Sequence, residues 1–177
     1  MSVFSISPLL AADQMRISPD AYPLFDAHTH PADIVRLLVA GQFPQDGLSM
    51  GLRLLPAPYA IAWVSQIAAL CKVDAKDVEG LQIVRLWMQS PSEHHRQNAY
   101  LYYRHATHDG IGFYLCAAVA YACDAITASV LVPISPCTCP ILLVAGLTTL
   151  AMQIPEQCDA QLSAWATELA DVMVRFL

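Results

Sequence analysis

Proline and glycine residues divide this sequence into blocks of helical length, and this division limits its fold more than any other feature. Within the blocks, apolar residues recur at the i, i+3, i+4, i+7 spacing of an amphipathic helix. Runs of four or more residues that alternate strictly between apolar and polar, as in a half-buried strand, are few and short, for example residues 15–18. The sequence therefore predicts an all-α fold, with about eight helices in consecutive antiparallel pairs around a central apolar helix.

Residues that begin or end helices bound the expected blocks. Pro31 stands where a missing N–H costs nothing, and Gly41 suits a left-handed cap at the end of that block. Asp74 and Ser92 can cap two further blocks. We expect helices over residues 29–41, 44–55, 59–73, 75–89, 93–107, 111–131, 141–152 and 155–176.

Three of these blocks have a clear apolar side. In the first it consists of Ile34, Leu37 and Leu38. In the 75–89 block it consists of Val78, Leu81, Val84 and Met88. The last block has a stripe of Leu162, Trp165, Ala166, Leu169, Met173 and Phe176.

Length and composition exclude several protein classes. The 177 residues are 56% hydrophobic and 14% charged, enough apolar surface to fold and too few residues for a hydrolase barrel of about 250. The net charge of −6 argues against nucleic acid as a partner. We expect an extended N-terminal segment over 1–25 and a single helical domain over 26–177.

The apolar run at 111–134 is long enough to span a bilayer of about 30 Å. Asp124 lies near its middle, where a charge costs about 2.5–3.5 kcal/mol, so we favour a buried helix. A small membrane protein with a span at 111–134 is the alternative. No Lys or Arg precedes Asp13, and the six cysteines lack the spacing of a disulfide framework, which predicts a cytoplasmic protein with reduced thiols.

Two motifs suggest catalytic chemistry. In barrel hydrolases an H-x-H pair at a strand end holds a metal, which makes a metal-dependent hydrolase using Asp26, His28 and His30 an alternative function. His105 and His108, at i and i+3, could contribute further ligands. No strand is predicted before residue 26, however, so we favour a helix-entry loop whose side chains satisfy exposed N–H groups.

The second motif is Gly47-Leu48-Ser49-Met50-Gly51, which matches the G-x-S-x-G elbow of a nucleophilic serine. That elbow needs a strand directly before it, whereas the residues before Ser49 begin a predicted helix. We interpret the two glycines as small packing positions. With no phosphate-binding loop or paired carboxylates, the sequence predicts no cofactor and no enzymatic activity.

Aromatic residues are the best candidates for a binding surface, because they dominate the energetics of protein interfaces. The interface candidates are Trp63, Trp87, Tyr102, Tyr103 and Trp165, each of which also suits a helical core. We expect a helix-lined apolar groove or patch that binds another protein. The apolar excess is also compatible with a homo-oligomer.

Packing residues in the first half carry a family resemblance: Pro31, Leu38, Gly41, Phe43, Asp46, Leu48, Leu55, Pro56, Ala60 and Trp63. Residues 31–71 thus resemble the opening of an uncharacterised bacterial family encoded near type VI secretion genes. The likeness extends over most of 26–177, although Gly47 stands where the family tends to have alanine and the 94–108 histidines fall outside its pattern. It implies an all-helical accessory protein whose partner is a secretion-system component, and it supplies no catalytic residues.

Overall fold

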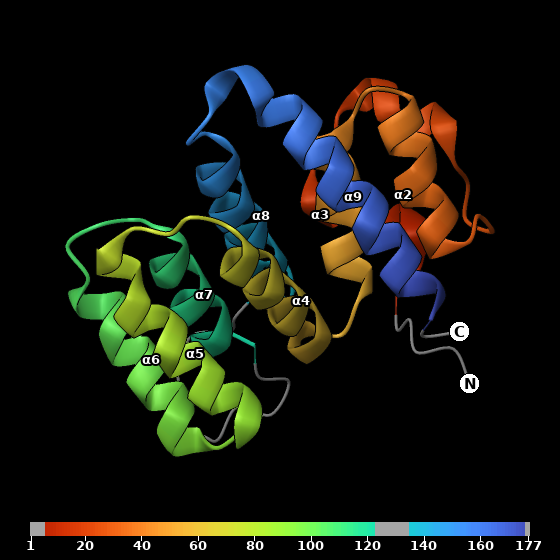
Figure 1. The fold of residues 1–177 in the computed structure, drawn as a ribbon. Coiled ribbons are helices and arrows are strands. Elements are labelled where there is room, and N and C mark those ends of the chain that lie inside the picture. The colour runs from red at the N-terminus through yellow and green to blue at the C-terminus, as the bar shows by residue number, and fades with distance from the viewer. Residues whose placement is uncertain (1–5, 123–134, 176–177) are drawn as a thin grey trace. The chain divides into compact units, whose positions relative to one another are not determined.

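The computed structural model describes residues 6–122 and 135–175, which form α-helices and short 3-10 helices and no strand (Figure 1). The all-α prediction is therefore confirmed. The chain divides into two compact units, residues 1–56 with 151–177 and residues 57–150. This division does not follow the boundary at residue 26 that the sequence suggested.

The first unit is built around three helices that pack on one another, α2 (Pro31–Ala40), α3 (Pro44–Leu54) and α9 (Cys158–Val174) (Figure 1). A 3-10 turn, η3 (Pro155–Gln157), leads into α9. The stripe expected on the last helix is confirmed for Leu162, Trp165, Ala166, Leu169 and Met173, all of which are buried; Phe176 lies outside the described residues.

Residues 8–24 are helical where an extended segment was expected. Helix α1 (Pro8–Met15) begins after Ser7, whose Oγ accepts a hydrogen bond from the Leu10 N–H, and η1 (Pro19–Leu24) follows. The Arg53 guanidinium on α3 donates two hydrogen bonds to the Gln14 side chain, at 2.7 and 3.0 Å. This tertiary contact, which no local pattern announces, fixes α1 on α3.

Two details of α2 differ from the sequence prediction. Leu37 is 40% exposed, and Val35 takes the buried place beside Ile34 and Leu38. Gly41 has a φ of −77°, and the left-handed residue is Gln42, with a φ of 67°. Gly41 is instead needed for space, because a Cβ there would lie 2.6 Å from Cδ1 of Leu24.

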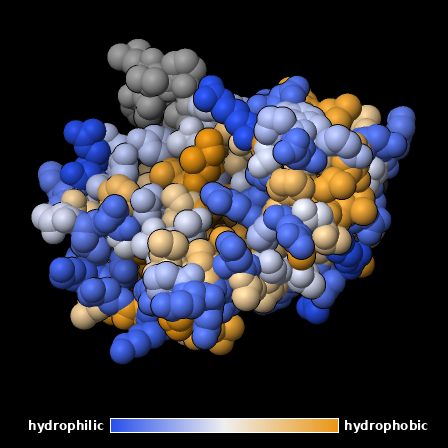
Figure 2. All heavy atoms as spheres, turned by 90° about the horizontal axis from the view of Figure 1, so that it is seen from above, coloured by the Kyte–Doolittle hydropathy of each residue, from blue (hydrophilic) through white to orange (hydrophobic). Residues whose placement is uncertain are grey.

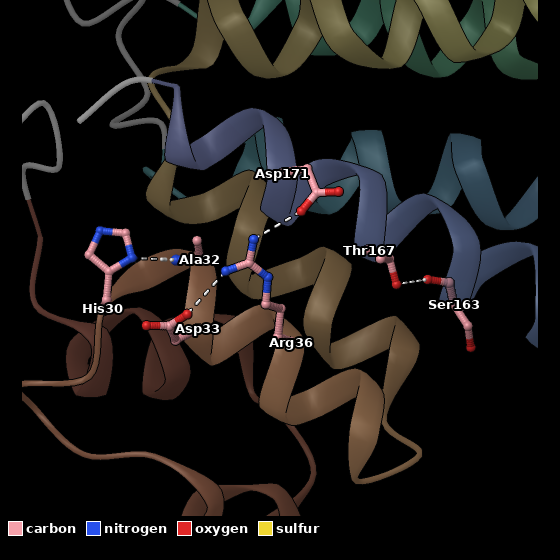
Figure 3. A network of polar contacts seen from close by, with 7 residues as sticks. All are labelled: His30, Ala32, Asp33, Arg36, Ser163, Thr167 and Asp171. Carbon is pink, nitrogen blue, oxygen red and sulfur yellow. Dashed lines mark hydrogen bonds and ion pairs between the residues drawn. The ribbon is translucent and has the colours of Figure 1, made fainter.

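A polar network ties α2 to α9 on the surface of this unit (Figure 3). The Arg36 guanidinium lies 3.2 Å from the Asp33 carboxylate, one turn earlier on α2, and 2.9 Å from the Asp171 carboxylate on α9. All three side chains are exposed to solvent, so water screens both pairs and their contribution to stability is small. The apolar contacts beneath the network hold the two helices together.

The second unit contains α4 (Ala57–Leu70), η2 (Ala75–Asp77), α5 (Val78–Gln89), α6 (Glu93–His105), α7 (Ile111–Ala120) and α8 (Thr138–Ala151). Helix α7 contacts α4, α5 and α6, and eight of its ten residues are buried. It ends at Ala120 where the sequence predicted 131, and residues 123–134 lie outside the described part of the chain.

No single helix among the described residues is long and apolar enough to cross a membrane. Thr138–Ala151 and Pro155–Val174 meet that requirement only when taken together across the break between them. The segment 111–134, considered as an alternative span, is described only as far as Ala122, and the helix in that described part is ten residues long.

The two glycines of α3 give a matched test of this packing. A Cβ on Gly47 would make ordinary contacts of 3.5 Å or more, whereas one on Gly51 would lie 2.5 Å from Cδ2 of Leu169. We expect Gly47→Ala to stabilise the protein by up to about 1 kcal/mol through helix propensity. Gly51→Ala should be less stable than Gly47→Ala by about 1–3 kcal/mol because of overpacking, as measured by urea denaturation. Equal stability of the two variants would contradict this account.

Candidate protein-binding groove

A groove of about 810 Å³ lies between α4 and α5. From α4 and the turn after it, the lining residues are Ser65, Gln66, Ala69 and Val73. From α5 they are Val78, Leu81, Gln82, Arg85, Leu86, Met88 and Gln89. We call this surface the α4–α5 groove.

The groove exists because its two walls bury other faces. Helix α4 buries Ile61, Val64 and Ile67, and α5 buries Val84 and Trp87. Helix α5 packs mainly against α6 and α7 and less closely against α4, and the groove lies between α4 and α5. The apolar side predicted for the 75–89 block is therefore real, but apart from Val84 it faces the groove.

Two large apolar side chains in the groove are exposed. Val78 is 52% exposed and Leu86 is 45% exposed. Figure 2 shows further apolar residues at the surface, in separate areas among hydrophilic ones. Scattered exposure of that kind is normal for a soluble protein, whereas apolar side chains gathered in a groove with polar residues around them are typical of an interaction site.

The three tryptophans proposed as interface residues lie in the cores of the units. Trp63 on α4 is 4% exposed, Trp87 on α5 is 7% exposed, and Trp165 on α9 is 6% exposed. None of them lines the groove. They pack in the interior of their units, and none of the three is exposed enough to contact a partner.

The two tyrosines of the same prediction have different surroundings. Tyr102 is half-buried, and its hydroxyl donates a hydrogen bond of 3.0 Å to the carbonyl of Lys76. Tyr103 belongs to a partly exposed aromatic cluster, with its ring centroid 5.0 Å from that of Phe113 and 6.0 Å from that of Tyr121. Neither lines the groove, so Tyr103 remains the only one of the five candidates within a surface cluster.

Asp77 is a buried carboxylate that the sequence did not single out. It is 4% exposed and accepts a hydrogen bond of 2.9 Å from the Gly112 N–H, in the first turn of α7. Nε2 of His108 lies 3.3 Å from the same oxygen. A negative charge here accepts a hydrogen bond from an N–H that has no partner within the helix, and the positive end of the α7 dipole stabilises that charge. Asp77 thus joins the beginning of α5 to the beginning of α7.

The residues around Asp77 leave little room for a ligand. A Cβ on Gly110 would lie 2.3 Å from both carboxylate oxygens, and one on Gly112 would lie 2.6 Å from the Asp77 carbonyl oxygen.

The Cys116 thiol on α7 donates a hydrogen bond to the Gly80 carbonyl, and burial, together with the nearby charges of Glu79 and Asp77, raises the pKa of this thiol to about 12. This thiol is therefore protonated and unreactive at neutral pH.

A second hollow of about 690 Å³ lies between α5 and α6. His105 and His108, proposed as metal ligands, are among its lining residues. In the parts of the chain that the structure describes, no three His, Cys, Asp or Glu side chains are grouped so that they could hold a metal. The nearest ionic partner of His108 is Asp77, which the α7 N-terminus already engages.

The Asp26-His28-His30 motif forms the predicted helix-entry loop. The Asp26 carboxylate accepts hydrogen bonds from the His28 N–H and the Thr29 hydroxyl, which together lower its pKa. Nδ1 of His30 accepts from the Ala32 N–H and so caps α2 (Figure 3). These side chains are used to shape the loop and begin the helix.

Ser49 lies in the middle of α3, and the residues before it are helical. It is 9% exposed, so its hydroxyl is not raised above a sheet as in a nucleophile elbow. Gly51 lies against Leu169 of α9, as the glycine-packing interpretation expected.

The Asp77 contact gives a test of the second unit. We expect Asp77→Ala to destabilise the protein by about 1–3 kcal/mol, because the Gly112 N–H loses its partner. Asp109→Ala, at an exposed neighbouring position, should change stability by less than about 0.5 kcal/mol. Urea denaturation of both variants measures the difference, and equal midpoints would refute the capping role.

The raised pKa of Cys116 predicts that this thiol is protected from alkylation in the folded protein. With a pKa of about 12, only about one thiol in ten thousand is ionised at pH 8. Brief alkylation with iodoacetamide followed by peptide mass spectrometry should leave Cys116 unmodified while the less buried Cys158 reacts. After denaturation the two should react alike. Rapid labelling of Cys116 in the folded protein would contradict the burial of its thiol.

Comparison with known proteins adds a family and no function. No curated protein and no solved structure matches this chain. The model of a family of unknown function, DUF6931, matches residues 34–173, which include the α4–α5 groove and most of both units. The chain therefore belongs to the DUF6931 family.

Proposed function

We propose that this protein is a non-enzymatic accessory or adaptor protein that binds a helix of another protein in the α4–α5 groove. The observation that carries this proposal is the groove lining, in which Val78 and Leu86 are about half exposed on a helix that buries Val84 and Trp87 on another side. An amphipathic helix would bury these side chains by laying its own apolar stripe between α4 and α5.

The kind of partner that we propose follows from the sequence resemblance. Because residues 31–71 resemble a family encoded near type VI secretion genes, we propose a component of a bacterial secretion system as the partner. The catalytic motifs support the non-enzymatic part of the proposal, since Ser49 is buried within a helix and Asp26 and His30 are engaged by backbone N–H groups.

A charged residue placed in the groove tests the proposal. We expect Leu86→Asp to weaken partner binding at least about tenfold, because docking would bury an unpaired carboxylate. Leu101→Asp is the matched control, a leucine on α6 that is 53% exposed and lies outside the groove. Circular dichroism establishes that both variants remain folded.

The measurement is affinity capture from secretion-competent cells that produce each variant, with quantitative mass spectrometry. A secretion component recovered with the wild type and Leu101→Asp, but lost with Leu86→Asp, supports the proposal. Recovery of the same proteins by all three, or of no secretion component by the wild type, contradicts it.

A further inference from the structure

The charges along the groove indicate what kind of helix it takes. Of the residues that line it, Arg85 is the only one with a charged side chain. Arg36, Arg53 and Arg96 are each held by side chains of their own unit. Within the described residues Arg85 has no ion pair, and its side chain is exposed at the edge of the groove.

The neighbours of Arg85 extend this edge along α5. Gln82 and Gln89 lie three residues before it and four residues after it, and helix geometry places such positions on one face. Both glutamines also line the groove. The residues of α5 that line the groove therefore include a guanidinium between two side-chain amides and no carboxylate, and the nearby Glu79 lines the hollow between α5 and α6 instead.

The length of the α5 wall limits the size of the occupant. From Val78 to Gln89 it extends about 16 Å at 1.5 Å per residue. That length matches about three turns of a docked helix, enough for three or four apolar side chains on one stripe. A strongly acidic tract is disfavoured, because the whole chain has a net charge of −6.

We propose that the α4–α5 groove takes about three turns of an amphipathic helix from another protein, with one Asp or Glu beside its apolar stripe that pairs with Arg85. This inference rests on the proposed function and adds a charge rule, namely that the bound helix carries an acidic residue that pairs with Arg85. The guanidinium can bind a carboxylate through two parallel hydrogen bonds, which sets the orientation of the helix. The pair gives specificity more than affinity, since the apolar contacts are common to all suitable helices.

A displayed library of helical peptides tests the rule. All members share one leucine stripe, and the positions beside the stripe are randomised among Glu, Lys, Gln and Ala. The library is selected on the wild type, Arg85→Glu, Arg85→Gln and Leu86→Asp. Arg104→Glu, with the same charge change at an exposed position on α6, is the matched control.

We expect the wild type and Arg104→Glu to enrich Glu over Lys about fivefold or more at one flanking position. Arg85→Glu should reverse that preference, and Arg85→Gln should abolish it. If peptides bind in the groove but the wild type and Arg85→Glu select the same charges, the charge rule is wrong and the proposed function stands. If the wild type retains no more peptide than Leu86→Asp, the groove binds no helix and both proposals fail.

Discussion

The buried carboxylate of Asp77 joins the beginning of α5 to the beginning of α7, and α5 in this position forms one wall of the groove. Its bond to the Gly112 N–H brings the beginning of α5 against the beginning of α7. The backbones can approach because Gly110 and Gly112 have no Cβ to collide with Asp77, and Gly80 has none to collide with Tyr102. With one side of α5 held against α7 in this way, the opposite side is left to form one wall of the α4–α5 groove.

Residue types that suggest chemistry serve as structural contacts in this protein. Asp26 and His30 accept hydrogen bonds from backbone N–H groups around the beginning of α2. Gly51, which could have belonged to a nucleophile elbow, lets α3 approach Leu169 on α9. The Cys116 thiol is buried and donates to a carbonyl. The α4–α5 groove remains accessible, with apolar and amide side chains and one cation among its lining residues, and it is this surface that we propose for recognition of a protein segment.

Much of the secondary structure could be predicted because its causes are local. Pro31 at the beginning of α2, Ser92 at the beginning of α6 and Pro44 at the beginning of α3 act through their own turns. The stripe of α9 is buried as its 3.6-residue period requires. Helix α1 was not predicted because it is only eight residues long and because the contact between Gln14 and Arg53 joins residues 39 apart in the sequence.

The sequence by itself determined that the chain is all-helical, where most helices begin and which residues form their apolar sides, since those properties depend on neighbours within a few residues. Only the tertiary structure decided which apolar side is buried and which is open. Leu169 and Val78 both belong to predicted apolar sides, yet Leu169 is fully buried and Val78 lines a groove, because helices from distant parts of the chain cover the first and not the second. Asp77 likewise looks like the start of its own helix, and only the fold turns its carboxylate to α7.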